Sequence, residues 1–188
     1  MKFSMVPSLL LPLLAAAAPV APENPPFSVM ATRSASPIHF LPMTASGQKF
    51  YLGGETTSYC PIGEGCPPGN QTVFAPGGYG MNVMVPGGQQ VYVDPKGALS
   101  FTQAHSAYIP EGSAVGPFNY KPGENWGYYT FDGWGTSGFM ACPTEDYRWQ
   151  VFAAVQNATV PKGNVAECLG FNALANTAPK EAAAWQYV

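Results

Sequence analysis

Charged side chains are scarce in this sequence. Only 8 of its 188 residues are Lys or Arg and 11 are Asp or Glu, so the formal net charge is −3. A nucleic-acid-binding protein needs a basic patch, and a strongly acidic substrate needs cationic partners in the same way. The charge content therefore argues against both kinds of partner.

Long apolar runs are absent except near the N-terminus. There Lys2 precedes the apolar stretch Leu9–Leu14, and a run of alanines follows. A positive start, a short apolar centre and small residues are the order found in secretory signal peptides. We therefore expect residues 1–18 to be a signal peptide, with cleavage between Ala17 and Ala21.

No second run has the length of a membrane span, so we expect no membrane partner. The last residues, Lys180–Val188, lack the hydrophobic tail of a lipid-anchor signal. Between the signal and the folded part, residues 19–26 form a proline-rich leader that should be extended. The sequence thus predicts a secreted protein in which residues 27–188 form a single domain.

Cysteine is also rare, with four residues at positions 60, 66, 142 and 168. An even number in an exported chain predicts two disulfides, and four cysteines allow three pairings. Short loops close at lower entropic cost, which favours Cys60–Cys66 and Cys142–Cys168. The spacing does not suit a zinc site, and we expect neither a metal nor a cofactor.

The chain is rich in aromatic residues (13%), glycine (21 residues) and proline (20 residues). Its clearest element is a hairpin. Val91 and Val93 alternate with polar positions on one strand, and Leu99 and Phe101 do so on the return strand. Between them, Asp94–Gly97 (Asp-Pro-Lys-Gly) has turn-forming residues at its first, second and last positions.

The rest of the chain repeats this pattern of short strands and turns. We expect an all-β fold of about eleven short antiparallel strands, as a sandwich or barrel, with a β-trefoil as the alternative. The last residues, Trp185–Val188, are expected to close the sheet against the N-terminal strand, and Thr177–Ala184 has the composition of a short helix. Three further segments are expected to be strands: Ile38–Met43, Thr72–Ala75 and Asn82–Val85.

Two Asn-x-Thr sequons lie in predicted loops, at Asn70-Gln71-Thr72 and Asn157-Ala158-Thr159. In a chain that passes through the secretory pathway, such sequons are N-glycosylation acceptors. We predict glycosylation at both Asn70 and Asn157.

The residues that could support catalysis are few. His39 and His105 are the only histidines, and no serine lies in a Gly-x-Ser-x-Gly elbow. Asp132, Glu145 and Asp146 occupy predicted turns, where acidic residues help the backbone to turn. They would matter only if the fold brought them together, so we expect no enzyme activity.

The aromatic residues give a better functional argument. Five of them crowd into a short region: Trp126, Tyr128, Tyr129, Trp134 and Trp149. Aromatic faces can stack on sugar rings, while their polar edges tolerate water. We assign Trp149 to the core, and we take Trp134, in a Gly-flanked turn, as the best surface candidate. The candidate glycan-binding residues are Trp134, Trp126 and Tyr128.

Several segments resemble the PhiA-like fungal secreted cell-wall proteins, which are also known as IgE-binding proteins. The resemblance covers nearly the whole mature chain. It implies a wall-associated protein of filamentous fungi, linked to asexual spore-forming cells and sometimes recognised by human IgE. No catalytic motif of the family can be carried over to numbered residues. The segments that carry the resemblance are TRSASPIHF (Thr32–Phe40), VPGGQQVYVDPKGALSFTQAHSAYIP (Val85–Pro110), FMACPT (Phe139–Thr144), CLGFNAL (Cys168–Leu174) and AAWQY (Ala183–Tyr187).

Three functions from different classes therefore compete. The first is a non-catalytic structural or developmental glycoprotein of the fungal wall, with wall polysaccharide or wall proteins as partners. The second is a carbohydrate-binding module, and the third is a secreted hydrolase that would depend on scattered carboxylates and His105. The sequence ranks them in that order.

Overall fold

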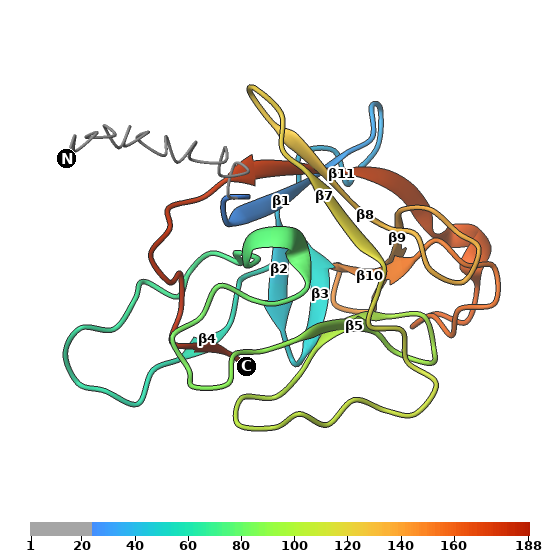
Figure 1. The fold of residues 1–188 in the computed structure, drawn as a ribbon. Helices are drawn as coiled ribbons and strands as arrows, with labels where there is room; N and C mark the ends of the chain where they lie inside the picture. Colours follow the sequence, from blue (N-terminus) through green and yellow to red (C-terminus); the bar gives the residue numbers. More distant parts are fainter. Residues whose placement is uncertain (1–23) are drawn as a thin grey trace, which may run out of the picture.

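The computed structural model describes residues 24–188, and these residues form an all-β fold (Figure 1). The predicted signal peptide, 1–18, and most of the proline-rich leader lie outside the described residues. No helix between residues 24 and 188 has the length and hydropathy that a bilayer crossing requires. The strands are β1 (Phe27–Thr32), β2 (Met43–Ser46), β3 (Lys49–Leu52), β4 (Ser58–Tyr59), β5 (Val91–Val93), β6 (Leu99–Phe101), β7 (Phe118–Lys121), β8 (Gly127–Phe131), β9 (Phe139–Pro143), β10 (Trp149–Ala153), β11 (Leu169–Thr177) and β12 (Gln186–Tyr187), with two short 3₁₀ turns, η1 (Pro76–Gly78) and η2 (Val165–Glu167).

Ten strands form one sheet in the order β5-β6-β3-β10-β9-β11-β8-β7, with β1 added to β11 and β2 to β3. The sheet curls into a half-barrel (Figure 1). Strand β11 joins its two halves, because its first residues pair with β9 while its later residues pair with β8 and β1. The strand pairings among residues 24–188 do not repeat three times, so the predicted barrel describes the fold better than the alternative β-trefoil.

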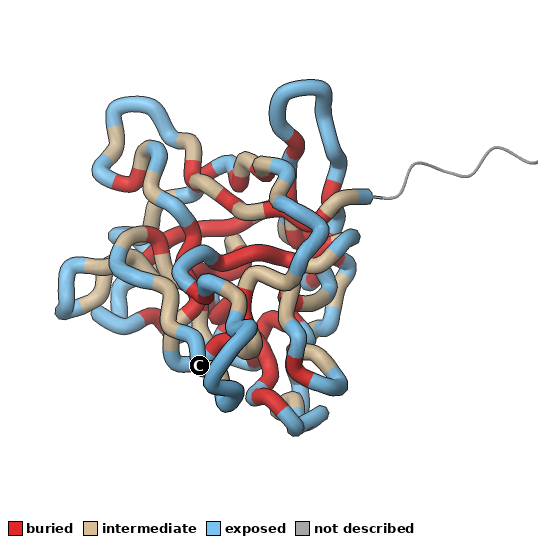
Figure 2. Tube along the Cα trace, turned by 90° about the vertical axis from the view of Figure 1, so that its left-hand side faces the viewer, coloured by how far each residue is buried: buried red, intermediate tan, exposed pale blue. Residues whose placement is uncertain are grey.

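The predicted hairpin is present as β5 and β6, with Val91 opposite Phe101 and Val93 opposite Leu99. Both faces of the hairpin are buried, although the alternating pattern suggested one exposed face. The segments around the hairpin therefore cover its second face as well. Figure 2 shows that buried residues gather in the centre of the molecule while the loop tips are exposed.

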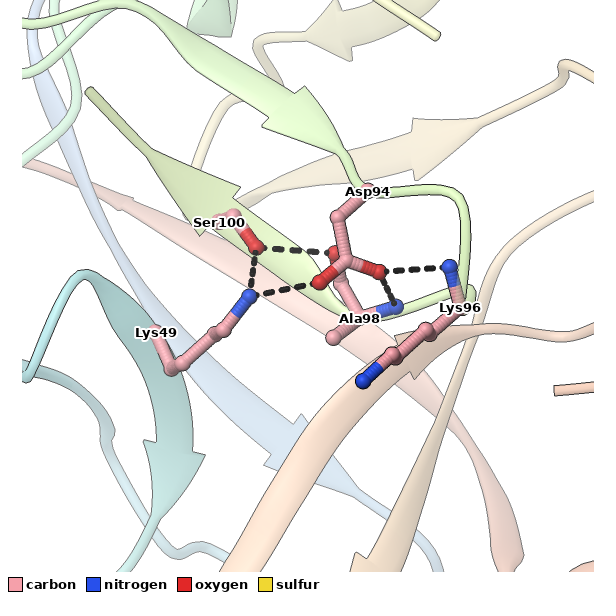
Figure 3. A network of polar contacts seen from close by, with 5 residues as sticks. All are labelled: Lys49, Asp94, Lys96, Ala98 and Ser100. Carbon is pink, nitrogen blue, oxygen red and sulfur yellow. Dashed lines mark hydrogen bonds and ion pairs between the residues drawn. The ribbon is translucent and has the colours of Figure 1, made fainter. Parts of the chain in front are cut away.

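A polar network fixes the turn of this hairpin (Figure 3). One carboxylate oxygen of Asp94 accepts hydrogen bonds from the backbone N–H groups of Lys96 (2.9 Å) and Ala98 (3.0 Å). The other pairs with the ammonium of Lys49 at 2.6 Å, and Lys49 also donates to the Ser100 hydroxyl at 2.8 Å. Both charges of this pair are therefore used in joining β3 to the hairpin.

Stacked aromatic rings form the centre of the core. Phe27 stacks on Phe74 (centroids 5.3 Å apart) and on Tyr120 (4.0 Å), and the Tyr129 hydroxyl donates to the carbonyl of Gly78 at 2.7 Å. Gly78 has a φ of +79°, and a Cβ there would lie 2.3 Å from the Tyr129 ring. Only glycine fits this close approach.

The C-terminal strand β12 pairs with β4, not with the N-terminal strand as expected. The buried side chain of Gln89 explains its position. Its amide oxygen accepts from the N–H of Tyr187 (2.8 Å), and its NH₂ donates to the carbonyls of Tyr187 (3.0 Å) and Thr102 (2.9 Å). A side-chain amide thus acts here in place of a neighbouring strand.

Four other expectations about local structure were wrong. Ile38–Phe40 is a turn, with Phe40 at a φ of +62°, and β2 begins only at Met43. Thr72–Ala75 and Asn82–Val85 form isolated bridges and no strands. The predicted helix at Thr177–Ala184 is absent: β11 runs on to Thr177, and Pro179 cannot donate the hydrogen bond that a helix interior needs.

The disulfides connect Cys60 to Cys66 and Cys142 to Cys168, the pairing that loop length favours. The first closes an exposed loop beside β4. The second joins the end of β9 to the residue before β11, and Cys142 is fully buried. It therefore fastens the strand that connects the two halves of the sheet.

Candidate functional site

Strand β8 presents one tyrosine to solvent and buries the next. Burial alternates along the strand, so Tyr128 is 50% exposed while Tyr129 is fully buried. Desolvation raises the pKa of Tyr129 well above its usual value of 10.0. Tyr129 is thus a core residue, and Tyr128 remains as the surface aromatic of this strand.

Tyr128 lies in a groove of about 470 Å³ on the exposed face of the sheet. Thr130 of the same strand and Asn172 of β11 add a hydroxyl and an amide to its lining. Two glycines leave the groove open: a Cβ on Gly138 or Gly170 would meet no atom within 4 Å. The groove thus combines an aromatic face with a hydroxyl and an amide, and Arg33 is the one charged residue in its lining.

Arg33 supports one side of this groove. Its guanidinium donates to the carbonyl of Gly170 at 2.7 Å, and the Thr32 hydroxyl donates to the carbonyl of Asn172 at 3.2 Å. These contacts hold the end of β1 against β11. The edge of the groove is therefore fixed by contacts between strands.

The apolar character of Tyr128 continues across the sheet. Tyr128 lies opposite Leu174 of β11, and Leu174 lies opposite Met30 of β1. All three side chains are partly or largely exposed. The sheet thus displays an apolar strip beside polar groups, an arrangement suited to a ligand with both apolar and hydroxyl-bearing faces.

The other two candidate aromatics do not line the Tyr128 groove. Trp126 is 50% exposed and precedes β8, two residues before Tyr128, but it does not line the groove. Trp134 is 47% exposed and follows β8, at the opposite end of the strand. It lines a separate pocket of about 320 Å³, and its ring meets Phe131 edge-on at 6.0 Å. The fold does not gather the three residues on one platform.

Neither histidine has the surroundings of a catalytic base. His39 accepts a hydrogen bond from the backbone N–H of Arg33 at 3.2 Å and stacks on Phe40 with centroids 3.8 Å apart. His105 is exposed and lines a pocket with Ser106, but no carboxylate contributes to that pocket. A triad would need one to orient the imidazole.

The three candidate carboxylates lie at opposite ends of β9. Asp132 accepts hydrogen bonds from Asn119 and from Ser137 (2.7 Å) in the connection between β8 and β9. Glu145 and Asp146 lie in the turn after β9. Hydrogen bonds from Arg148 and Thr144 lower the pKa of Asp146 to about 2. Asp132 and Asp146 thus stabilise turns through these hydrogen bonds, and the fold does not place their carboxylates as a facing pair.

Metal ligation also lacks support from the described part of the chain. In residues 24–188 no three His, Cys, Asp or Glu side chains are grouped so as to hold an ion.

Both sequon asparagines are exposed. Asn70 borders the largest of the described pockets, about 530 Å³, and Asn157 lines the Trp134 pocket. Glycosylation at both positions stays a prediction.

Comparison with known proteins identifies the family of this chain. A family model described as "PhiA-like secreted protein" matches residues 27–188. The chain belongs to the PhiA-like secreted protein family. It is also similar to an Arthroderma benhamiae protein named "Uncharacterized secreted protein", with 48% identity over 198 aligned residues that cover all of both chains. No solved structure matches the chain.

The family assignment confirms the resemblance noted in the sequence, and family and relative are both described as secreted. For a PhiA-like protein, the structure adds groove residues that sequence reasoning missed. Asn172 could have been found from the alternation in Leu169–Thr177. Arg33 and the open position at Gly170 could not, because they depend on the pairing of β1 with β11.

Proposed function

We propose that this PhiA-like protein is a non-catalytic glycoprotein of the fungal cell wall, with a structural role, and that it binds neutral wall polysaccharide through the Tyr128 groove. The observation that carries the proposal is the half-exposed Tyr128 ring in a groove of about 470 Å³ with hydroxyl and amide groups on its walls. A role in asexual spore-forming cells is part of the proposal and is supported by the family resemblance.

The charge content favours a neutral ligand. Neutral polysaccharide offers no charges, and this chain has few to offer in return. Each aromatic contact contributes about 0.5–1.5 kcal/mol beyond burial, by analogy with aromatic pairs. A groove with one tyrosine, an adjoining apolar strip and several hydrogen bonds therefore suits binding in the roughly micromolar to millimolar range.

The test is a pull-down of the mature protein with insoluble chitin, β-glucan and mannan, in low and in concentrated salt. We expect retention on one of these polymers in both buffers, because salt screens charges and leaves stacking intact. Tyr128→Ala should lose most of the retention. Tyr147→Ala is the matched control, since Tyr147 is 96% exposed in the turn after β9 and lines none of the described pockets.

The result separates the alternatives. Equal retention of wild type and Tyr128→Ala would exclude the groove as the binding site. Retention lost in concentrated salt would indicate ionic attachment. Cleavage of any of the polymers by the wild-type protein would overturn the non-catalytic assignment.

A further inference from the structure

The Trp134 pocket contains one of the two sequon asparagines in its own wall. It has a volume of about 320 Å³, and its lining includes Trp134, Lys96 and Asn157. This volume is at the small end of the range for ligand sites, about 300–1,000 Å³. The pocket shares no lining residue with the Tyr128 groove, so its role is independent of polysaccharide binding at that groove.

The loops that carry Trp134 and Asn157 are tied together. The Thr136 hydroxyl donates to the carbonyl of Ala154 at 2.7 Å, which joins the Trp134 loop to the segment that leads to Asn157. Just beyond Asn157, the N–H of Thr159 donates to the carbonyl of Lys96 at 2.8 Å. The hairpin turn thus supports the sequon loop. These hydrogen bonds hold the loop that carries Trp134 and the loop that carries Asn157 in fixed positions relative to each other.

Trp134 is held outward at some cost. Its φ is +56°, a left-handed conformation that bulky side chains rarely adopt without strain. The ring meets the Phe131 ring edge-on and stays 47% exposed. Core packing does not account for a strained, half-exposed tryptophan at this place.

We propose that Asn157 carries an N-linked glycan and that the first sugars of this glycan lie in the pocket against the Trp134 ring. The covalent step uses a lipid-linked oligosaccharide of the secretory pathway. The Asn157 Nδ2 atom forms the bond to the anomeric carbon, loses one proton, and the lipid pyrophosphate leaves. Thr159 completes the Asn-x-Thr acceptor.

The chain's own glycan fits this pocket better than a free polymer. A sugar bonded to Asn157 begins at the pocket wall, so its contact with Trp134 is intramolecular and carries no cost of association. The apolar face of an N-acetylated sugar can cover the indole, as aromatic stacking requires. A glycan in this position also blocks the pocket to any external ligand.

The experiment uses the full chain, secreted from a eukaryotic host that glycosylates its proteins. Peptide mass analysis gives the occupancy of Asn157, and hydroxyl-radical labelling read by mass spectrometry gives the accessibility of each tryptophan. Thr159→Ala removes the acceptor and retains the backbone N–H that bonds Lys96. Thr159→Ser keeps the acceptor and is the matched control. Trp126, half exposed like Trp134, serves as the internal reference.

The expected result is an occupied Asn157 and labelling of Trp134 that is severalfold slower in wild type and Thr159→Ser than in Thr159→Ala, with Trp126 unchanged in all three. An unmodified Asn157 would overturn the proposal. So would an occupied Asn157 with equal Trp134 labelling in wild type and Thr159→Ala, since the glycan would then point away from the ring.

Discussion

At positions 128 and 129 two identical side chains have opposite roles. Tyr128 faces the groove, and Tyr129 donates a hydrogen bond to Gly78 inside the core. The alternation along Gly127–Phe131 is visible in the sequence, but composition alone does not say which of the two faces is buried. Packing of Phe27 and Phe74 against Tyr129 decides it.

The buried phenol of Tyr187 leads to a prediction about alkaline pH. Burial raises the pKa of Tyr187 from 10.0 to about 12. The folded protein keeps this proton to higher pH than the unfolded chain, so the stabilisation is complete below pH 10 and is lost as the pH rises to about 12. A shift of this size corresponds to about 2–3 kcal/mol.

Urea unfolding between about pH 9 and pH 12 measures this loss. Tyr187→Phe should be less stable near pH 9, because the hydrogen bonds to Gln71 and Val73 are lost, and its stability should fall less steeply above pH 10. If the free energy of unfolding fell equally with pH in wild type and in Tyr187→Phe, the buried phenol would not be the cause of the loss.

At the scale of elements, the sequence predicts best where a turn is explicit. Asp94–Gly97 sets the hairpin of β5 and β6, and loop length favours the observed disulfides. The sequence predicts local structure poorly where a segment depends on contacts with residues far away in the chain. Ile38–Met43 looks like a strand, yet the Phe40 N–H bonds back to the carbonyl of Ala31 at 2.8 Å and the chain turns.

The C-terminal strand gives a second prediction. Gln89→Met keeps the volume of the side chain but removes its three hydrogen bonds to Tyr187 and Thr102. Buried backbone groups would be left unpaired, so we expect the free energy of unfolding to fall by about 2–4 kcal/mol in urea titrations. A matched substitution of the exposed neighbour, Gln90→Met, should have little effect. Equal stability of wild type and Gln89→Met would show that β12 is held by other contacts.

The two disulfides should contribute unequally. The Cys142–Cys168 bridge spans 26 residues and Cys60–Cys66 spans 6. Loop entropy predicts a loss of about 3–4 kcal/mol for replacing the first pair with serine and about 2 kcal/mol for the second. Thermal or urea unfolding of the two double variants checks the order. A larger loss for the exposed Cys60–Cys66 loop would contradict this account.

At the scale of the whole molecule, low charge, export and an all-β fold could be derived from the sequence. The groove could not, because its members come from β1, β8 and β11, which are far apart in the chain and meet only through sheet pairing. Tyr128 was recognisable as a candidate. Asn172 could be recognised only as a polar position in the alternation of Leu169–Thr177. The contact of Arg33 and the open position at Gly170 depend on the pairing of β1 with β11.

Retention by fungal cell walls tests the proposed binding through the Tyr128 groove most directly. Isolated walls of the fungus that expresses the chain are washed with concentrated salt, and the protein in wall and wash is measured for wild type and Tyr128→Ala. Wild type should stay with the wall through the salt wash, because salt does not screen stacking on Tyr128 or hydrogen bonds between neutral groups. Tyr128→Ala should be found mainly in the medium and the wash. Release of wild type by salt, or equal wall retention of the two proteins, would contradict it.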